Sequence, residues 1–236
     1  MSGKTVIEQV IGKATAAFPA REITPPQYAA MKYLKWLPMM RFVCRQYTLK
    51  GFGNLFTMET HAMGGLMKLS TMVFTPYSGK SVPFLLVDTM EMKKKRLAYV
   101  EYYDCTAKGA SMPESERQAA EFAALPDYAE KPAWYVSRRT PYSLIKGGEG
   151  ADDAALEAMI LTCVDRYLNA AKDAPIDPDN LPGLRDFQHD MLVLGNPSSG
   201  TLNKVLGKEG AELAFKTAIM PVEPPEGAGR TSGKPQ

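Results

Sequence analysis

The chain has 236 residues, of which 45% are hydrophobic and 23% are charged. This is ordinary globular composition, and it excludes a long disordered chain, a collagen-like repeat and a disulfide scaffold. The net charge of +2 is too close to balance to favour nucleic acid as the main partner. No apolar run approaches the ~20 residues that a membrane helix needs, so we expect a protein that does not enter a membrane.

The N-terminus and the cysteines indicate the compartment. The first residues carry an acid at Glu8 and no continuous apolar stretch, so a secretory signal is not expected. Cys44, Cys105 and Cys163 are far apart in the sequence, which favours free thiols in a reducing compartment. We therefore expect a cytoplasmic protein.

The first half of the chain changes from helix to strand near Pro38. Apolar spacing predicts an amphipathic helix over 4–18 and a second helix over 28–36. Short alternating segments separated by glycine and proline turns then predict an antiparallel meander. Its five strands are expected at 40–49, 55–61, 66–74, 82–88 and 97–104.

The second half is mainly helical. We predict a helix over 113–125, a last strand over 132–137 and a long helix over 154–171. Two more helices flank the turn at 195–197, and the last ends near Met220. Residues 1–222 are thus expected to form one α+β domain, an α/β/α sandwich with a central antiparallel sheet flanked by helices. Residues 223–236 are rich in proline and glycine and are expected to be a disordered tail.

Two carboxylates fall in strands that otherwise look buried, Asp88 and Glu101. If residues 91–96 form the hairpin loop, Met90 faces Leu97 and Asp88 faces Tyr99. Then Asp88, Tyr99, Glu101 and Tyr103 share one face of the sheet. Desolvation among aromatic rings would raise the pKa of both acids and allow them to donate protons. The alternative is a solvated polar face.

Other candidate motifs are weaker. Asp186 and Asp190 share a helix face, which alone is typical of a solvated surface. The glycine-rich stretch 147–150 is a poor phosphate nest and is more typical of a flexible loop. The sequence has no dinucleotide, Walker or zinc-protease motif, and only His61 and His189 besides the three cysteines, so no metal site is expected.

Three segments are similar to one known family. Phe187 and Asp190 precede the segment 196–207, which runs from an Asn-Pro turn to Gly207, and a final helix closes on Pro221. This order resembles the C-terminal segment of the ferredoxin-dependent bilin reductases, with its turn, short helix, break and last helix. Segment 83–88 looks like the family's Pro-x-x-Gly-x-Asp strand without its glycine. Segment 132–137 is similar to the family's Pro-x-Trp-Gly-x-x-x-Ser, again without the glycine and one residue shorter.

Position 101 departs from the family. Glu101 stands where the family has its active-site aspartate, and in this it looks more like the related red chlorophyll catabolite reductases. This leaves open whether the substrate is a bilin or a chlorophyll catabolite, and which double bond is reduced. The resemblance covers about residues 40–221.

The resemblance implies a tetrapyrrole held between the sheet and the C-terminal helices. Reduced ferredoxin would supply electrons singly, through bilin radicals, and the protein would hold no flavin, nicotinamide or metal. Glu101 from the sheet and Asp190 from the helix are the expected proton donors, with Asp186 as a less favoured helix candidate and Asp88 orienting or relaying. The protein would be a monomer of the cytoplasm, or of the plastid stroma in a eukaryotic phototroph, although no transit peptide is visible.

Cations and polar groups are expected to hold the substrate. Its propionates would pair with guanidinium or ammonium groups, and a ring carbonyl with an imidazole, although a lone surface histidine is an open alternative. The expected residues are His61, Arg138, Arg139, Lys68, Arg45, Tyr99 and Tyr103. The hairpin residues Lys93, Lys94, Lys95 and Arg96 would steer an acidic ferredoxin, or would simply form a solvated tip.

Two other functions compete with this one. The first is a tetrapyrrole carrier or chaperone that kept the fold without turnover, which the missing glycines make realistic. The second is an unrelated α+β protein whose acidic face is only structural. Bilin binding without reduction would indicate the carrier, and no bilin binding would indicate the unrelated protein.

Overall fold

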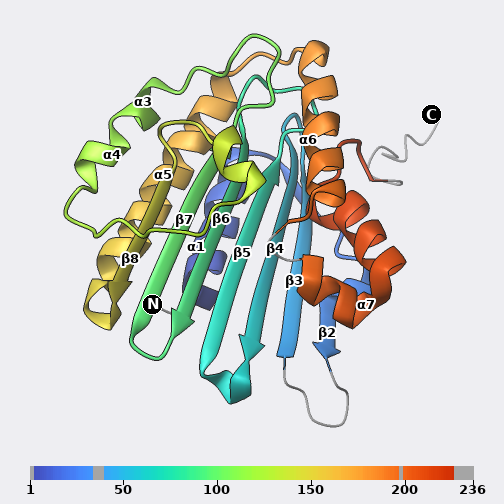
Figure 1. The fold of residues 1–236 in the computed structure, drawn as a ribbon. Helices are drawn as coiled ribbons and strands as arrows, with labels where there is room; N and C mark the ends of the chain where they lie inside the picture. Colours follow the sequence, from blue (N-terminus) through green and yellow to red (C-terminus); the bar gives the residue numbers. More distant parts are fainter. Residues whose placement is uncertain (1–2, 34–39, 197–198, 226–236) are drawn as a thin grey trace.

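A twisted antiparallel sheet forms the centre of the molecule (Figure 1). The computed structural model describes residues 3–33, 40–196 and 199–225. The strands are β1 (Ala20–Glu22), β2 (Ala30–Tyr33), β3 (Met40–Leu49), β4 (Gly53–Ala62), β5 (Met67–Thr75), β6 (Phe84–Met92), β7 (Lys95–Tyr103) and β8 (Leu144–Glu149). Strands β3 to β7 follow one another as antiparallel neighbours, which confirms the predicted meander.

Helices cover both faces of this sheet (Figure 1). They are α1 (Gly3–Ala17), α2 (Pro26–Ala29), α3 (Pro113–Glu116), α4 (Gln118–Glu121), α5 (Asp153–Asp173), α6 (Leu181–Val193) and α7 (Ser199–Ala214), which continues as a π-helical turn (Phe215–Ile219). Short 3₁₀ helices are η1 (Met63–Gly65), η2 (Trp134–Arg138), η3 (Gly150–Asp152) and η4 (Pro178–Asn180). The chain is therefore an α+β protein with the predicted sandwich architecture.

Four local predictions were wrong. The helix expected over 28–36 is the short α2 followed by β2, because this segment pairs with the edge of β3; its part beyond residue 33 lies outside the described residues. The helix over 113–125 is divided into α3 and α4. The strand over 132–137 is η2, and the loop expected at 147–150 belongs largely to β8. In η2, tertiary packing overrides the β-propensity of Trp, Tyr and Val.

One face of the sheet packs on α1 and α5. Strand residues such as Leu85, Val100 and Tyr102 are fully buried there against Met159 and Tyr167 of α5. The Tyr167 hydroxyl donates a hydrogen bond to the Pro83 carbonyl at 2.8 Å, which satisfies its polar end inside the core. Helices α1 and α5 therefore cover much of this face of the sheet, and the opposite face is the one left for a cavity.

The opposite face packs on α6 and α7. Phe84 of β6 contacts Phe187 of α6 with ring centroids 5.6 Å apart, and Tyr103 of β7 lies 4.8 Å from the same ring. Helix α7 is interrupted at Gly207, whose φ of 72° lies in the left-handed region. The resemblance places a break at this position. This face holds the cavity described below.

Every helix among the described residues is too short or too polar to span a lipid bilayer. In the same part of the chain, no group of three or more His, Cys, Asp or Glu side chains is arranged to hold a metal ion. The predicted tail from residue 226 onward lies outside the described residues.

The first turn of α6 approaches the end of β7 closely at Gly183. A Cβ atom there would lie 2.3 Å from the Cys105 carbonyl oxygen. We expect Gly183→Ala to lower the free energy of unfolding by about 2 kcal/mol, because backbone must shift to admit the methyl group. Gly12 of α1 has open space around its Cα, so Gly12→Ala is expected to raise stability by up to about 1 kcal/mol. Urea unfolding of both variants checks the contrast, and equal effects would contradict it.

Candidate active site

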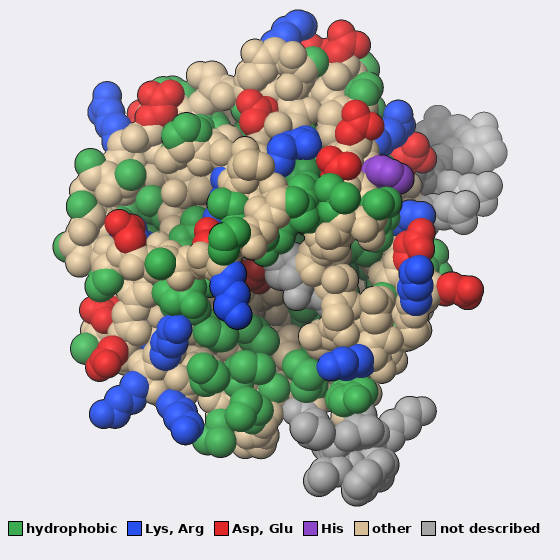
Figure 2. Space-filling model, viewed as in Figure 1, with side chains coloured by type: hydrophobic (Ala, Val, Ile, Leu, Met, Phe, Trp, Pro, Cys, Tyr) green, Lys and Arg blue, Asp and Glu red, His purple; other side chains and the backbone are tan. Residues whose placement is uncertain are grey.

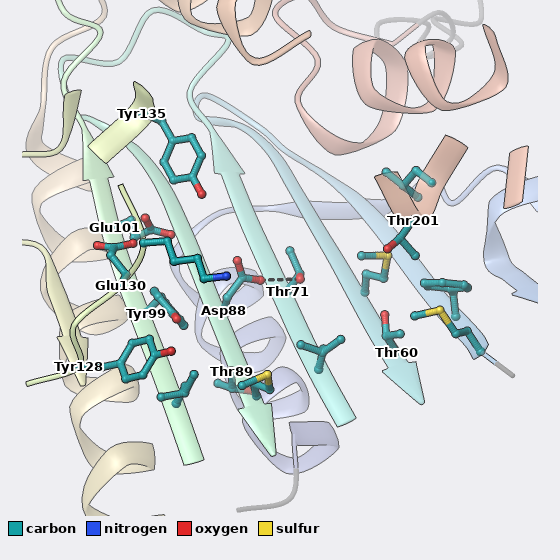
Figure 3. Close-up of a pocket in the computed structure, with 18 of the residues that line it drawn as sticks. Thr60, Thr71, Asp88, Thr89, Tyr99, Glu101, Tyr128, Glu130, Tyr135 and Thr201 are labelled. Atoms are coloured by element: carbon teal, nitrogen blue, oxygen red, sulfur yellow. Dashed lines mark hydrogen bonds between the residues drawn. The ribbon is translucent and has the colours of Figure 1, made fainter. Parts of the chain in front are cut away.

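A cavity of about 410 Å³ lies between the sheet and α7 (Figure 3). Strands β3 to β7 form its floor, α7 contributes Thr201 and Leu202, and the segment 128–139 forms its other side. In space-filling view this side of the molecule is hollowed near its middle (Figure 2). The lining residues from the sheet are Met40, Phe42, Met58, Thr60, Leu69, Thr71, Asp88, Thr89, Met90, Leu97, Tyr99 and Glu101, and those from segment 128–139 are Tyr128, Glu130, Lys131, Tyr135 and Arg139.

The β6–β7 register brings the two predicted acids to this cavity. Asp88 pairs with Tyr99 and Leu86 pairs with Glu101, as the sequence predicted. The connection is shorter than expected, because Glu91 also pairs with Arg96 and only Lys93 and Lys94 form the turn. Because the loop is shorter by the same number of residues on both strands, every cross-strand pair is kept. Each side chain therefore stays on the predicted face of the sheet.

Asp88 is half-buried in the cavity floor. Its carboxylate accepts a hydrogen bond of 2.5 Å from the Thr71 hydroxyl on β5 (Figure 3). Burial raises the pKa of Asp88 to about 6, and the Thr71 hydrogen bond opposes this increase. Asp88 also borders a small apolar recess of about 40 Å³ under α6 and the C-terminal turn. It is therefore an acid that holds a proton for part of the time near neutral pH.

Glu101 is more deeply buried, with 3% of its surface exposed. The Tyr103 hydroxyl donates a hydrogen bond to it at 2.8 Å, and the Arg139 guanidinium forms an ion pair with it. Burial raises the pKa of Glu101 to about 7, although the positive charge of Arg139 lowers it. Glu101 is thus present in the cavity wall but held by two partners.

Arg139 joins three parts of the site. Its guanidinium contacts Glu101 of β7 and both carboxylate oxygens of Glu130, one of them at 2.8 Å. The guanidinium carbon also lies 5.8 Å from the centre of the Tyr135 ring. The pKa of Arg139 is raised above its ordinary value because its carboxylate contacts outweigh the effect of burial, so it remains a cation.

Tyrosines line the side of the cavity opposite α7. The Tyr99 and Tyr128 rings meet edge to face with centroids 6.2 Å apart. Burial raises the pKa of Tyr99 to about 12, so its hydroxyl stays protonated and can donate a hydrogen bond. Tyr103, by contrast, packs between Phe84 and Phe187 and contacts Glu101 from behind. Tyr103 does not line the cavity, so the structure does not support its predicted contact with a ligand there.

The helix-borne acids lie elsewhere. Helix α6 buries Leu184, Phe187, Gln188 and Met191, which places Asp186 and Asp190 on its other side. Both line an open surface depression with His189 and Arg138. Arg138 Nη1 lies 3.3 Å from Asp190 Oδ2, and its side chain is 42% exposed. The structure thus does not bring Asp186, Asp190 or Arg138 together with Glu101.

Three predicted ligand contacts lie on the wrong face of the sheet. Arg45, His61 and Lys68 line a groove beside α1, with His61 Nε2 3.4 Å from a Glu59 oxygen. Side chains alternate along a strand, and Phe42, Met58 and Thr71 occupy the cavity side. Arg45, His61 and Lys68 therefore face away from the cavity and cannot contact a ligand in it.

The predicted basic hairpin is partly exposed. Lys93 and Lys94 form its exposed turn, and Lys95 Nζ lies 4.6 Å from the centre of the Tyr128 ring at the cavity edge. Arg96 instead donates a hydrogen bond of 2.8 Å to Asp153 at the start of α5. Of the hairpin lysines, Lys95 thus contacts a residue that lines the cavity, whereas Arg96 binds α5.

Several cavity residues were not predicted. Thr71 pairs with Asp88 in the β5–β6 register, so extending the predicted register by one strand would have found it. Glu130, Lys131 and Tyr135 come from a segment that forms neither a strand nor an α-helix, although a strand was predicted over 132–137. No local sequence signal indicates that this segment folds over the sheet.

The burial of Asp88 predicts an unusual pH dependence of stability. A raised pKa favours the folded state below about pH 4, and this advantage is lost as pH rises through 6. Asp88→Asn should therefore match the wild type near pH 4 and exceed it at pH 8 by on the order of 2 kcal/mol. Urea unfolding at both pH values measures this. Asp165→Asn, which removes from α5 the ion-pair partner of Lys13 of α1, serves as a control. A difference in stability between Asp88→Asn and the wild type that is the same at both pH values would contradict the prediction.

The fold places the chain among α/β/α sandwich proteins with a central antiparallel sheet. No protein-family model and no curated protein sequence matches the chain. Among solved structures it is similar to phytochromobilin synthase from tomato in complex with biliverdin. The TM-score is 0.73 at 11% sequence identity, and the match covers 91% of this chain and 81% of the tomato chain. The two proteins share a fold.

Proposed function

We propose that the protein binds an open-chain tetrapyrrole, biliverdin or a related bilin, in this cavity and reduces it with electrons from a ferredoxin. The observation that carries the proposal is the pair of acids Asp88 and Glu101. Both have pKa values raised toward neutrality and line one cavity on the sheet face under α7. The shared fold with a phytochromobilin synthase crystallised with biliverdin supports the choice of ligand.

The cavity wall suits a flat conjugated ligand with polar edges. Apolar side chains of β3, β4 and β5, such as Phe42, Met58 and Leu69, offer a surface for ring contacts. At the other side, Lys131 supplies positive charge that matches a propionate carboxylate, and Arg139 lies in the same lining, paired with Glu101 and Glu130. Tyr99 and Tyr135 add hydroxyl groups next to the acids.

The proton chemistry assigns Asp88 as the first donor. Each reduced double bond takes two electrons and two protons, and a bilin that has gained an electron is a stronger base. An acid with a pKa of about 6 delivers a proton near neutral pH and is recharged from solvent. Asp88 has one hydrogen-bond donor, Thr71, whereas Glu101 is engaged by Arg139 and Tyr103. Glu101 is therefore the second donor, or the group that fixes Arg139.

The electron donor would approach the basic hairpin. Lys93, Lys94 and Lys95 lie where β6 ends and β7 begins, and side chains of both strands form part of the cavity floor. Opposite charge on a ferredoxin would steer its approach to this edge. Added salt should then slow the reaction with ferredoxin more than it weakens bilin binding.

Anaerobic incubation with biliverdin, ferredoxin and a reducing system tests the proposal. Turnover predicts loss of the biliverdin absorption and a new product band. A binding shift that does not progress favours the second candidate, a tetrapyrrole carrier. The ion pair of Glu101 with Arg139 favours that candidate, because a carboxylate fixed in this way is not free to donate. Absence of any spectral change would contradict both.

A further inference from the structure

Arg139 holds two carboxylates where one would balance its charge. Glu130 binds it through a two-pronged contact in which both carboxylate oxygens face guanidinium nitrogens. Glu101 contacts the same guanidinium from the sheet. Such a planar two-pronged contact is the arrangement that a guanidinium also forms with a ligand carboxylate.

The two carboxylates differ in how firmly they are fixed. Glu101 lies on β7, has 4% of its side chain exposed and also binds Tyr103. Glu130 has 22% exposed and lies in an irregular segment. Within the described part of the chain, no backbone hydrogen bond ties residues 129–132 to the sheet, although Tyr128 N donates to the Ile145 carbonyl. Glu130 is the carboxylate that can leave without opening the core.

Arg139 also has unused binding capacity. Its side chain is 7% exposed, and its Nε–H is buried without a hydrogen-bond partner in the described structure. An unsatisfied buried donor is unfavourable, and a ligand that supplies an acceptor removes that penalty. Lys131 follows Glu130 in sequence and lines the same cavity, so displacing Glu130 leaves a second cation at the cavity edge.

We propose that Glu130 is an internal substitute for a ligand carboxylate, and that a carboxylate-bearing ligand displaces it from Arg139 on binding. This inference rests on the proposed function, because it names a propionate of the tetrapyrrole as the displacing group. The exchange replaces one charge pair by another, so Arg139 is never left as an unpaired buried charge. Glu130 then moves out with residues 129–132 and sets the affinity for ligands that carry a carboxylate.

Glu130→Gln tests this by absorbance titration with two ligands, biliverdin and biliverdin dimethyl ester. Removing the internal competitor should tighten biliverdin binding about tenfold, the equivalent of ~1.4 kcal/mol, and leave binding of the ester unchanged. Glu209→Gln, at an exposed position of α7, is the matched control and should change neither. An equal effect on both ligands, or no effect, would overturn the proposal.

Hydrogen exchange separates failure of this inference from failure of the proposed function. In the free protein, Glu130→Gln should accelerate exchange of the Tyr128 amide, which donates to the Ile145 carbonyl, relative to wild type, with no bilin involved. In the wild type, saturating biliverdin should accelerate exchange of the same Tyr128 amide. If neither the wild type nor Glu130→Gln binds bilin, the proposed function fails. Comparing amide exchange of the two proteins without bilin still decides whether Glu130 holds residues 129–132 in place. Unchanged exchange in the free variant would overturn the internal contact.

Discussion

Bilin reduction by Asp88→Asn is expected to be slower than wild type by a factor of about 10²–10⁴, the usual contribution of a positioned general acid. Asparagine keeps the size of the side chain and can still accept the Thr71 hydrogen bond, but it cannot supply a proton. Biliverdin affinity should therefore change little. Anaerobic single-turnover kinetics and an absorbance titration on the same preparation measure the two quantities separately.

Asp190→Asn is the matched control for this prediction. Asp190 lies outside the cavity, in the surface depression where it contacts Arg138. Its replacement should leave the rate close to wild type. A slow Asp190 variant with a normal Asp88 variant would reverse the assignment and return the proton donor to α6.

Arg139→Met is expected to lower the free energy of unfolding at pH 8 by about 3–5 kcal/mol, because it leaves Glu101 as a buried charge without its partner. At pH 4 the loss should be smaller, since Glu101 can then be protonated in both the folded and the unfolded state. Urea unfolding at the two pH values gives the comparison.

The double variant Arg139→Met with Glu101→Gln provides the internal check. Removing both charges should restore much of the stability, because the deeply buried carboxylate is gone and the remaining one, Glu130, has 22% of its side chain exposed to solvent. If the single variant loses less than about 1 kcal/mol, a value typical of exposed pairs, the ion pair behaves as a surface contact and its proposed part in the site is wrong.

Parity along the strands explains which site residues the sequence could predict. Asp88 and Glu101 were placed correctly because their cross-strand partners depend only on a symmetric hairpin. Arg45, His61 and Lys68 were chosen for their charge alone, and the same alternation places them on the far side of the sheet. The β6–β7 register therefore predicted the position of the two acids. The same reasoning, extended across β4 and β5, would have excluded the three cations from the cavity.

The contacts of Arg139 show what the sequence could not supply. Its partners Glu101 and Glu130 come from a strand and from an irregular segment, and they meet only after residues 126–139 fold over β7 and β8. The same segment carries Trp134, whose indole donates a hydrogen bond of 2.7 Å to the Gly195 carbonyl. Long-range contacts of this kind turned a predicted strand into η2.

Equilibrium titration of biliverdin against a blocked cavity tests the central claim most directly. Thr201 of α7 lines the cavity opposite the acids (Figure 3), whereas Thr217 is exposed outside it. Wild type and Thr217→Trp should bind biliverdin alike, and Thr201→Trp should bind it at least about tenfold more weakly, a loss of ~1.4 kcal/mol or more. Equal affinity for all three proteins, or no binding by the wild type, would contradict a tetrapyrrole site between the sheet and α7.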